Sequence, residues 1–312
     1  VIDVGTNSIK LLVADVAGHD VRPVWEDSKQ TRLGSGFYET HRLQPEAVEK
    51  TAAAVARFAV AARERNASSI RVIATSAARD AVNPGDLTSA IAAACGLKAE
   101  IISGDREAEW AFRGVTTDPE LARLHLLLLD VGGGSAQFIL GQGEQTHFRH
   151  SFLMGAVRLM EKIPHSDPPT AQELSACREW LKKFLDEHVR PLLEPAMRRE
   201  AKYGPVGNRQ IQLVGTGGTA SILSRLEAQL EEFDRARIEA TRLSLAQIRT
   251  QMKRLWHLPL EERKRIIGMP KKRADVILTG VAIYEAVMEQ FDFGELRVST
   301  RGLRFAAVMD GA

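Results

Sequence analysis

Two kinds of hydrophobic pattern alternate along the chain. Short apolar runs predict strands at Val1–Val4, Ile9–Val16, Val21–Asp27, Ile70–Ala74, Lys98–Ile102, Leu126–Asp130, Ala136–Leu140, Ile211–Val214 and Leu296–Ser299. Longer helical stretches begin at Pro45, Glu107, Thr170 and Ala220, and most of 221–290 is also helical in pattern. Asp86 can cap a helix that stops at Gly96, and the last helix is expected at Leu303–Met309. Strands that alternate with helices favour an α/β architecture with a largely central sheet.

An internal repeat joins the two halves of this pattern. Asp3–Ser8 and Asp130–Ser135 share the sequence Asp-Val-Gly-x-x-Ser, and each follows one predicted strand and precedes another. The shared strand–turn–strand context predicts that the chain carries a duplicated unit.

Length and composition predict a folded protein of two domains. The chain has 312 residues, of which 44% are hydrophobic and 26% charged, and single cores rarely grow beyond about 250–300 residues. The net charge of +2 and the two cysteines, Cys95 and Cys177, predict neither a charged partner nor a disulfide framework. No apolar run approaches the roughly 20 residues of a membrane span. We therefore expect a cytoplasmic protein without a membrane partner.

The two Asp-Val-Gly turns have the chemistry of a phosphate site. Glycine permits close approach of the backbone, and the amides and hydroxyls that follow it can donate hydrogen bonds to an anion. Asp3 and Asp130 would repel phosphate unless a cation intervenes, and Mg²⁺ prefers oxygen ligands. Two ordinary hairpin turns are the alternative interpretation. The candidate phosphate-binding residues are Gly5, Thr6, Asn7 and Ser8 in the first turn and Gly132, Gly133, Gly134 and Ser135 in the second.

A third glycine loop connects a strand to a helix. It comprises Gly215, Thr216, Gly217, Gly218 and Thr219, and the helix is expected to begin at Ala220. Backbone amides at a helix N-terminus suit phosphate, although a tight strand–helix connection would have the same pattern. The chain has no Walker A loop and no Rossmann glycine pattern after a strand.

Two further segments offer catalytic side chains. Arg79 follows a strand and could bind phosphate oxygens with two N–H groups, although a surface arginine is usually just solvated. Glu107 and Glu109 lie near a helix start, where a carboxylate stabilises the helix dipole or could act as a general base on water. Spacing alone does not choose between these roles.

A basic cluster surrounds Pro270. It predicts either a solvated helix face or a track for a polyanion, and nucleic acid is disfavoured because no aromatic residues interleave with the charges. The cluster consists of Arg263, Lys264, Arg265, Lys271, Lys272 and Arg273.

These motifs together resemble the exopolyphosphatase/guanosine pentaphosphate phosphohydrolase family. The segments that match in order are Asp3–Ser8, Ala74–Asn83, Ser103–Ala108, Asp130–Ser135, Gly155–Leu159, Gly215–Thr219, Arg273–Gly280 and Val298–Arg304. The resemblance implies two duplicated α/β domains around a central cleft, in the ribonuclease H-like fold of actin, sugar kinases and Hsp70 chaperones. We expect them at 1–119 and 120–299, with the final helix of about 300–312 packed back on the first.

The resemblance also assigns roles. The family pattern Gly-x-x-Glu-Ala falls on Gly104–Ala108, which makes Glu107 the catalytic glutamate and leaves Glu109 without that role. Arg79 becomes the phosphate-binding arginine, and Asp130 and Asp3 become the candidate ligands of Mg²⁺, with a monovalent cation as a further candidate. Relative to the family, Gln137 replaces a glutamate that helps to hold the metal, and Phe305 replaces a glutamate near the end. Gln137 could still ligate Mg²⁺ through its amide oxygen, with lower affinity.

The expected activity is therefore Mg²⁺-dependent hydrolysis of the terminal phosphate of inorganic polyphosphate by a water that Glu107 activates. Guanosine pentaphosphate is the alternative substrate. Two further hypotheses are a weakly active sensor that binds polyphosphate or nucleotide, which Gln137 favours, and an ATP-dependent kinase of the same fold. We expect a homodimer, the commonest assembly of such enzymes.

Overall fold

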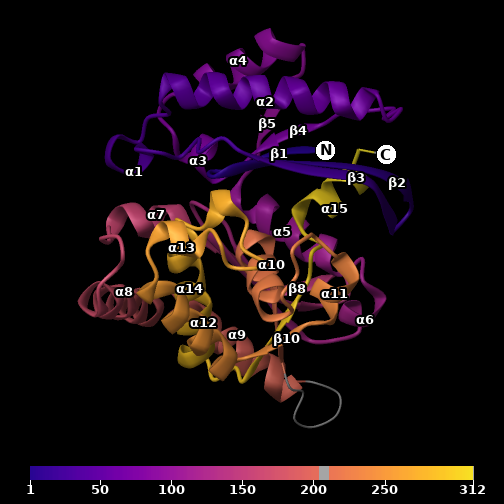
Figure 1. Cartoon of the computed structure of the whole chain (residues 1–312). Coiled ribbons are helices and arrows are strands. Elements are labelled where there is room, and N and C mark those ends of the chain that lie inside the picture. The colour runs from indigo at the N-terminus through magenta and orange to yellow at the C-terminus, as the bar shows by residue number, and fades with distance from the viewer. Residues whose placement is uncertain (204–210, 312) are drawn as a thin grey trace. The chain divides into compact units, whose positions relative to one another are not determined.

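The computed structural model describes residues 1–203 and 211–311, and its contacts divide the chain into two compact units. The first unit combines Val1–Thr117 with the segment that starts at Arg301, and the second is Asp118–Thr300. Each unit contains its own sheet and helices, so the predicted α/β class is confirmed. Figure 1 shows the elements of both units with their labels.

The sheet of the first unit has five strands in the order β3-β2-β1-β4-β5. The first three form an antiparallel meander, whereas β4 and β5 run parallel to β1. All three residues of β1 are buried, including the carboxyl of Asp3 between two apolar neighbours. The strands are β1 (Ile2–Val4), β2 (Ser8–Ala17), β3 (Asp20–Gln30), β4 (Val72–Ala74) and β5 (Ala99–Ile101).

One face of this sheet is covered by α2 (Pro45–Arg63), as Figure 1 shows. Proline occupies its first turn, where the missing N–H is not needed. Its buried residues include Val48, Val55 and Phe58, whose helical spacing directs them toward the sheet. The short helices α1 (Phe37–Thr40) and α3 (Ser76–Asp80) and the helix α4 (Pro84–Cys95) complete this side.

Asp86 does not cap α4, so that prediction is wrong. The helix begins at Pro84, its N-cap position is Asn83, and Asp86 lies inside the first turn. The Asn83 side chain donates to Asp86 at 2.8 Å and also accepts a hydrogen bond from the N–H of Leu43. The helix therefore starts at Pro84, three residues before Leu87, where a cap at Asp86 would have placed its start. The predicted end is confirmed, because Gly96 ends α4 with a φ of 72°.

The other face of the first sheet is covered by α5 (Gly104–Val115) and α15 (Leu303–Met309), the last helix of the chain. Trp110, Ala306 and Ala307 pack there with residues of the sheet. The two helices approach so closely that a Cβ added at Gly114 would lie 2.0 Å from the Gly302 carbonyl oxygen. The C-terminal segment therefore completes the core of the first unit.

The sheet of the second unit has six strands in the order β8-β7-β6-β9-β11-β10. Its first five strands repeat the arrangement of the first unit: an antiparallel meander of β6, β7 and β8, followed by β9 and β11 parallel to β6. The predicted duplication is confirmed by this shared order. The strands are β6 (Leu126–Val131), β7 (Ala136–Gln142), β8 (Gln145–Phe152), β9 (Gln212–Thr216), β10 (Arg242–Ser244) and β11 (Glu295–Val298).

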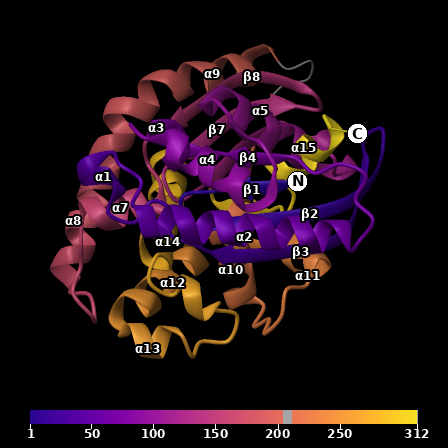
Figure 2. The same ribbon diagram turned by 90° about the horizontal axis from the view of Figure 1, so that it is seen from above.

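The helices of the second unit pack around α14, whose buried residues run from Ile277 to Met288 without interruption. A helix that is buried on all sides and is mostly apolar belongs inside a core. Figure 2 shows α8 and α9 following one another along the unit, and the π-helix Leu185–Val189 joins them. The helices are α6 (Pro119–Ala122), α7 (Ala156–Lys162), α8 (Ala171–Phe184), α9 (Arg190–Tyr203), α10 (Gly217–Glu227), α11 (Arg235–Ala240), α12 (Leu245–His257), α13 (Leu260–Arg263), the 3-10 helix η2 (Lys271–Arg273) and α14 (Ile277–Gln290).

The two cysteines of the chain do not pair with each other. Cys95 and Cys177 are free thiols, and burial raises the pKa of Cys177 to about 12, which makes its thiolate scarce at neutral pH. Among the helices of residues 1–203 and 211–311, none combines the length and apolar character that a membrane span requires.

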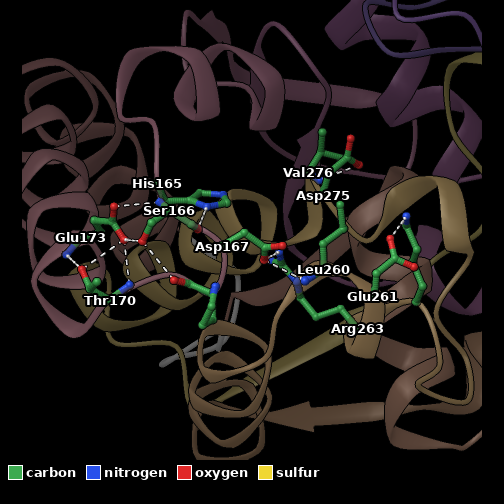
Figure 3. Close-up of polar contacts among 12 residues, drawn as sticks. His165, Ser166, Asp167, Thr170, Glu173, Leu260, Glu261, Arg263, Asp275 and Val276 are labelled. Carbon is green, nitrogen blue, oxygen red and sulfur yellow. Dashed lines mark hydrogen bonds and ion pairs between the residues drawn. The ribbon is translucent and has the colours of Figure 1, made fainter.

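A hydrogen-bonded loop precedes α8 and is drawn in Figure 3. Glu173 accepts hydrogen bonds from the N–H of Thr170 at 2.7 Å and from the N–H of Ser166 at 2.8 Å, and the hydroxyls of both residues also donate to it. With the Thr170 hydroxyl, which accepts from the N–H of Glu173, this forms a capping box. The bonds from Thr170 and then Ser166 lower the pKa of Glu173 to about 2.

We expect Glu173→Gln to lower the melting temperature at pH 7 by about 1–4 °C, because glutamine can keep the capping box but lacks the negative charge that the surrounding donors and the helix N-terminus stabilise. Because the folded-state pKa lies below the ordinary value of 4.5, the stabilisation is complete above pH 4.5 and is lost as the pH falls toward 2. Circular dichroism melts from pH 7 to pH 3 should therefore show the difference between the native and variant proteins shrinking.

Glu179→Gln is the matched control, because Glu179 is exposed on the same helix. It should melt as the native protein does at every pH. A difference for Glu173→Gln that stays constant as the pH falls would contradict the prediction.

Candidate functional site

The first predicted phosphate loop is a tight turn between β1 and β2. The Gly5 N–H donates to the Ser8 carbonyl oxygen at 3.1 Å, and an added Cβ at Gly5 would meet that oxygen at 3.0 Å. The segment after β3 packs against the turn: the N–H of Gly34 donates to the Thr6 carbonyl, and the N–H of Arg32 donates to the Asn7 carbonyl. The backbone of the loop is therefore held in place from outside.

Three buried polar atoms in or beside this loop have no hydrogen-bond partner among the described residues. They are Nδ2 of Asn7, a donor, Oδ1 of Asp3, an acceptor, and Oγ1 of Thr31, whose N–H donates to the Asn7 carbonyl. Burial raises the pKa of the Asp3 carboxyl above its usual value, and the positive charges of Lys10 and Arg304 oppose that rise. Since buried polar groups are normally paired, the side chains of Asn7 and Asp3 are candidate contacts for a ligand.

Arg79 and Glu107, predicted from separate segments, meet in the first unit. Nη1 of Arg79 lies 2.8 Å from Oε2 of Glu107 and also donates to the Ile102 carbonyl at 3.3 Å. Arg79 comes from α3 after β4, and Glu107 from the first turn of α5 after β5, so two adjacent parallel strands deliver them to the same sheet edge. Glu107 is 7% exposed. The pair thus fixes the orientation of a buried carboxylate.

The second predicted loop repeats the turn of the first. The Gly132 N–H donates to the Ser135 carbonyl at 2.9 Å, and an added Cβ at Gly132 would again lie 3.0 Å from that oxygen. The first turn is held by the segment after β3, whereas the second turn is held by the start of α7, which packs against it. The N–H groups of Ala156 and Val157 donate to the carbonyls of Gly132 and Gly133.

Gly155, just before α7, was not predicted to matter individually. A Cβ added there would lie 2.4 Å from the Gly133 carbonyl oxygen and 2.4 Å from the Gly134 carbonyl carbon. Only glycine allows α7 to approach the second loop this closely. The structure shows that this glycine turn is packed against the start of a helix.

The third loop brings an acidic and a basic side chain to the start of α10. The helix begins at Gly217, whose φ is 86°, and not at Ala220 as predicted. Added Cβ atoms would lie 2.6 Å from Oδ1 of Asp130 at Gly217 and 2.5 Å from Nη2 of Arg273 at Gly218. The two glycines therefore make room for these side chains, and the helix N-terminus adds amides suited to an anion.

Tyr284 of α14 supports the same strand ends. Its hydroxyl lies 3.1 Å from the carbonyl oxygens of both Leu129 and Thr216, at the ends of β6 and β9. Burial, and then the charge of Asp130, raise the pKa of this hydroxyl well above its usual value, so it remains a hydrogen-bond donor. Sequence reasoning missed this role because the residue lies in an apolar helix.

The six residues of the predicted polyanion track do not form one exposed surface. Arg263 is only 1% exposed, and its Nη2 lies 3.3 Å from Oδ1 of Asp167. Figure 3 shows the two side chains facing one another. Lys264 pairs with Glu261, and Arg273 lies against Gly218, whereas Arg265, Lys271 and Lys272 are exposed. The prediction of a solvent-facing track is therefore wrong for Arg263, because the guanidinium points into the unit.

The two departures from the family pattern lie inside the fold. Phe305 is buried in a small cluster with Leu12 and Val21, so its position has an apolar packing role. Gln137 is 1% exposed, and its amide nitrogen donates to the hydroxyls of Ser135 and Ser151. Within residues 1–203 and 211–311, no group of three or more His, Cys, Asp or Glu side chains could hold a metal by itself.

Comparison with known proteins decides the family. The model of the Ppx/GppA phosphatase family matches residues 12–310. The chain belongs to the Ppx/GppA phosphatase family. Exopolyphosphatase 2 of Mycobacterium tuberculosis is 36% identical over 298 residues, which cover 93% of this chain and 89% of that protein.

Solved structures of other Ppx/GppA proteins have the same fold as this chain. The crystal structure of the Aquifex aeolicus family member shares 28% identity and a TM-score of 0.77, and the alignment covers 99% of this chain and 95% of that one. An exopolyphosphatase from Cytophaga hutchinsonii shares 26% identity and a TM-score of 0.84, with coverage of 100% and 97%. The resemblance drawn from the sequence motifs, the actin-like fold class and the prediction of a phosphate-removing enzyme are thereby confirmed at the level of the family.

Proposed function

We propose that this Ppx/GppA protein is an exopolyphosphatase that hydrolyses the terminal phosphate of inorganic polyphosphate. The main support for polyphosphate as the substrate is the 36% identity to Exopolyphosphatase 2, which extends over nearly the whole of both chains. The local geometry is compatible with this chemistry, because three glycine turns and a buried carboxylate–guanidinium pair supply anion donors and a candidate base.

Glu107 is the proposed general base. Its Oε2 is held by Arg79, and its position in the first turn of α5 keeps it on a rigid element. The carboxylate orients a water molecule and accepts its proton as the water oxygen attacks the terminal phosphorus. The bond between that phosphorus and the bridging oxygen breaks, and the shortened chain leaves as a phosphate anion, which needs no acid to protonate it.

Donors for the phosphoryl oxygens come from side chains and from the glycine turns. Nδ2 of Asn7 is the buried donor without a partner, and Arg79 lies beside the base. In the second unit, Arg273 lies against Gly218 at the start of α10. Donors that are fixed before the reaction stabilise the developing charge without reorganisation.

The residues present fit a magnesium ion. Asp3 has a buried oxygen without a donor, and Asp130 lies at the glycine turn that opens α10. Mg²⁺ is commonly bound through one or two carboxylates together with substrate phosphates and waters, so the lack of a larger acidic cluster in the described ranges is compatible with it. Asp130 is proposed as a ligand within the second unit, and Asp3 as a ligand within the first. A bound Mg²⁺ would offset the negative charge of the transferring phosphoryl group.

Phosphate release should be measured from long-chain polyphosphate and from guanosine pentaphosphate, each with Mg²⁺ and with chelator. We expect release from polyphosphate that Mg²⁺ supports and chelator lowers by about 10²-fold or more, because charge on the phosphoryl oxygens is then uncompensated. Faster phosphate release from guanosine pentaphosphate would identify that compound, and not polyphosphate, as the preferred substrate. Tight polyphosphate binding without release from either compound would contradict hydrolysis and favour a sensor.

A further inference from the structure

Gln137 lies within a row of four polar residues that crosses the sheet of the second unit. The strand register places Asp130 opposite Thr216 on one side and opposite Gln137 on the other, and it places Gln137 opposite Ser151. Residues directly opposite one another on neighbouring strands project from the same face. Gln137 therefore lies beside Asp130, the next-to-last residue of β6, and near the loop that follows that strand.

The amide nitrogen of Gln137 uses both of its hydrogens on serine hydroxyls. Nε2 donates to Oγ of Ser135 at 2.8 Å and to Oγ of Ser151 at 3.1 Å. Gln137 and Ser135 are each 1% exposed, so water does not compete for these bonds. An amide nitrogen is a donor only, and each serine oxygen must therefore be the acceptor.

This arrangement decides where the hydrogen of the Ser135 hydroxyl points. A hydroxyl has one hydrogen and two lone pairs, and one lone pair is already occupied by the amide. The carbonyl oxygens of Gly132, Gly133 and Gly134 accept hydrogen bonds from the start of α7, and that of Ser135 accepts from the Gly132 N–H. Among the hydrogen bonds of the described residues, Oγ of Ser135 takes part only as the acceptor from Nε2 of Gln137, so its own hydrogen is available to a ligand held by the loop.

A carboxylate in place of this amide would reverse that polarity. An ionised glutamate only accepts hydrogen bonds, so both serine hydroxyls would have to donate to it. Their lone pairs would then face the ligand, which suits a cation and repels a phosphate oxygen. The glutamine amide instead favours a phosphate oxygen over a cation, although glutamine and glutamate have nearly the same shape.

We propose that Gln137 is a positioning residue that turns the Ser135 hydroxyl into a hydrogen-bond donor for a phosphate oxygen. The second loop then holds phosphate directly and depends less on a bound cation than it would with a glutamate. This inference rests on the proposed phosphohydrolase function for the identity of the anion. It gives Gln137 a role that differs from the metal ligation predicted from the sequence.

The test is equilibrium binding of inorganic tripolyphosphate, measured by titration calorimetry with chelator and again with Mg²⁺. The native protein should bind in chelator, and Ser135→Ala should weaken that binding by about 10- to 100-fold, the effect of losing one hydrogen bond to a charged acceptor. Gln137→Glu should weaken it similarly in chelator but much less in Mg²⁺. An equal loss under both conditions, or no loss for Ser135→Ala, would overturn the proposal.

Two further variants distinguish a change in the hydrogen-bond direction at Ser135 from general damage to the fold. Gln142→Glu introduces the same charge at the end of the same strand and should bind as the native protein does. Gln137→Met removes the two donors without adding a charge next to Asp130 and should weaken binding in chelator by about 3- to 10-fold, because the hydroxyl can then turn away. Native-like binding by Gln137→Met would count against the proposal. Absence of phosphate release with this binding pattern intact would overturn the proposed activity alone.

Discussion

Glu107→Gln should lower kcat for phosphate release by about 10²- to 10⁴-fold, the usual contribution of a general base. Glutamine keeps an oxygen that Arg79 can contact, so the guanidinium stays in place while the proton acceptor is lost. We therefore expect KM and the affinity for polyphosphate to change little. The measurement is steady-state release of phosphate from polyphosphate in Mg²⁺, together with direct binding of the same substrate.

Glu109→Gln is the matched control, because Glu109 lies on the same helix but outside the family pattern. It should retain nearly native kcat, and both variants should melt at nearly the native temperature. A large loss in Glu109→Gln with near-native kcat in Glu107→Gln would move the general base to the other residue. Equally small effects of the two substitutions on kcat would mean that neither Glu107 nor Glu109 is the general base.

Gly155→Ala should lower kcat/KM by about 10²-fold, the typical result of displacing catalytic groups by about 1 Å. The new methyl group would lie 2.4 Å from the Gly133 carbonyl oxygen, and that backbone has no flexible end to move aside. Either the second loop or α7 must shift. Overpacking of this kind should also destabilise the unit by about 1–3 kcal/mol, which urea denaturation would measure.

Gly294→Ala provides the comparison. An added Cβ at Gly294 meets no atom within 4 Å, and the residue belongs to the same unit. Its activity should be native, and its free energy of unfolding should change by less than about 0.5 kcal/mol. Native activity and stability in Gly155→Ala would show that the second loop tolerates movement and that its close contact with α7 has no role in the reaction.

Much of the fold could be predicted because burial leaves a direct pattern in the sequence. Strands such as β6 are buried on both faces and read as continuous apolar runs, and the repeated Asp-Val-Gly turns revealed the duplication. The last helix was predicted with its observed bounds, Leu303–Met309. Helix starts were harder, because Pro84 begins its helix before Asp86, which resembles a cap, and Gly217 begins its helix before the predicted start at Ala220.

The candidate site was predictable only as separate segments. Arg79 and Glu107 are far apart in the sequence, and their contact depends on β4 and β5 being neighbours in the sheet. The burial of Arg263 could not be foreseen, because its neighbours Lys264 and Arg265 suggest a solvated face. The role of Gly155 follows from the distance between two backbones, which no pattern of hydrophobic and polar residues encodes.

The position of α15 has a consequence for synthesis of the protein. The second unit is continuous in sequence, so its core is complete once Thr300 has left the ribosome. The first unit begins to emerge earlier, yet Trp110 and the nearby face of its sheet remain uncovered until Ala306 and Ala307 arrive. An apolar surface exposed for that interval is a site for aggregation or chaperone binding. The first unit is thus the later of the two to finish folding, although most of its residues are made before those of the second.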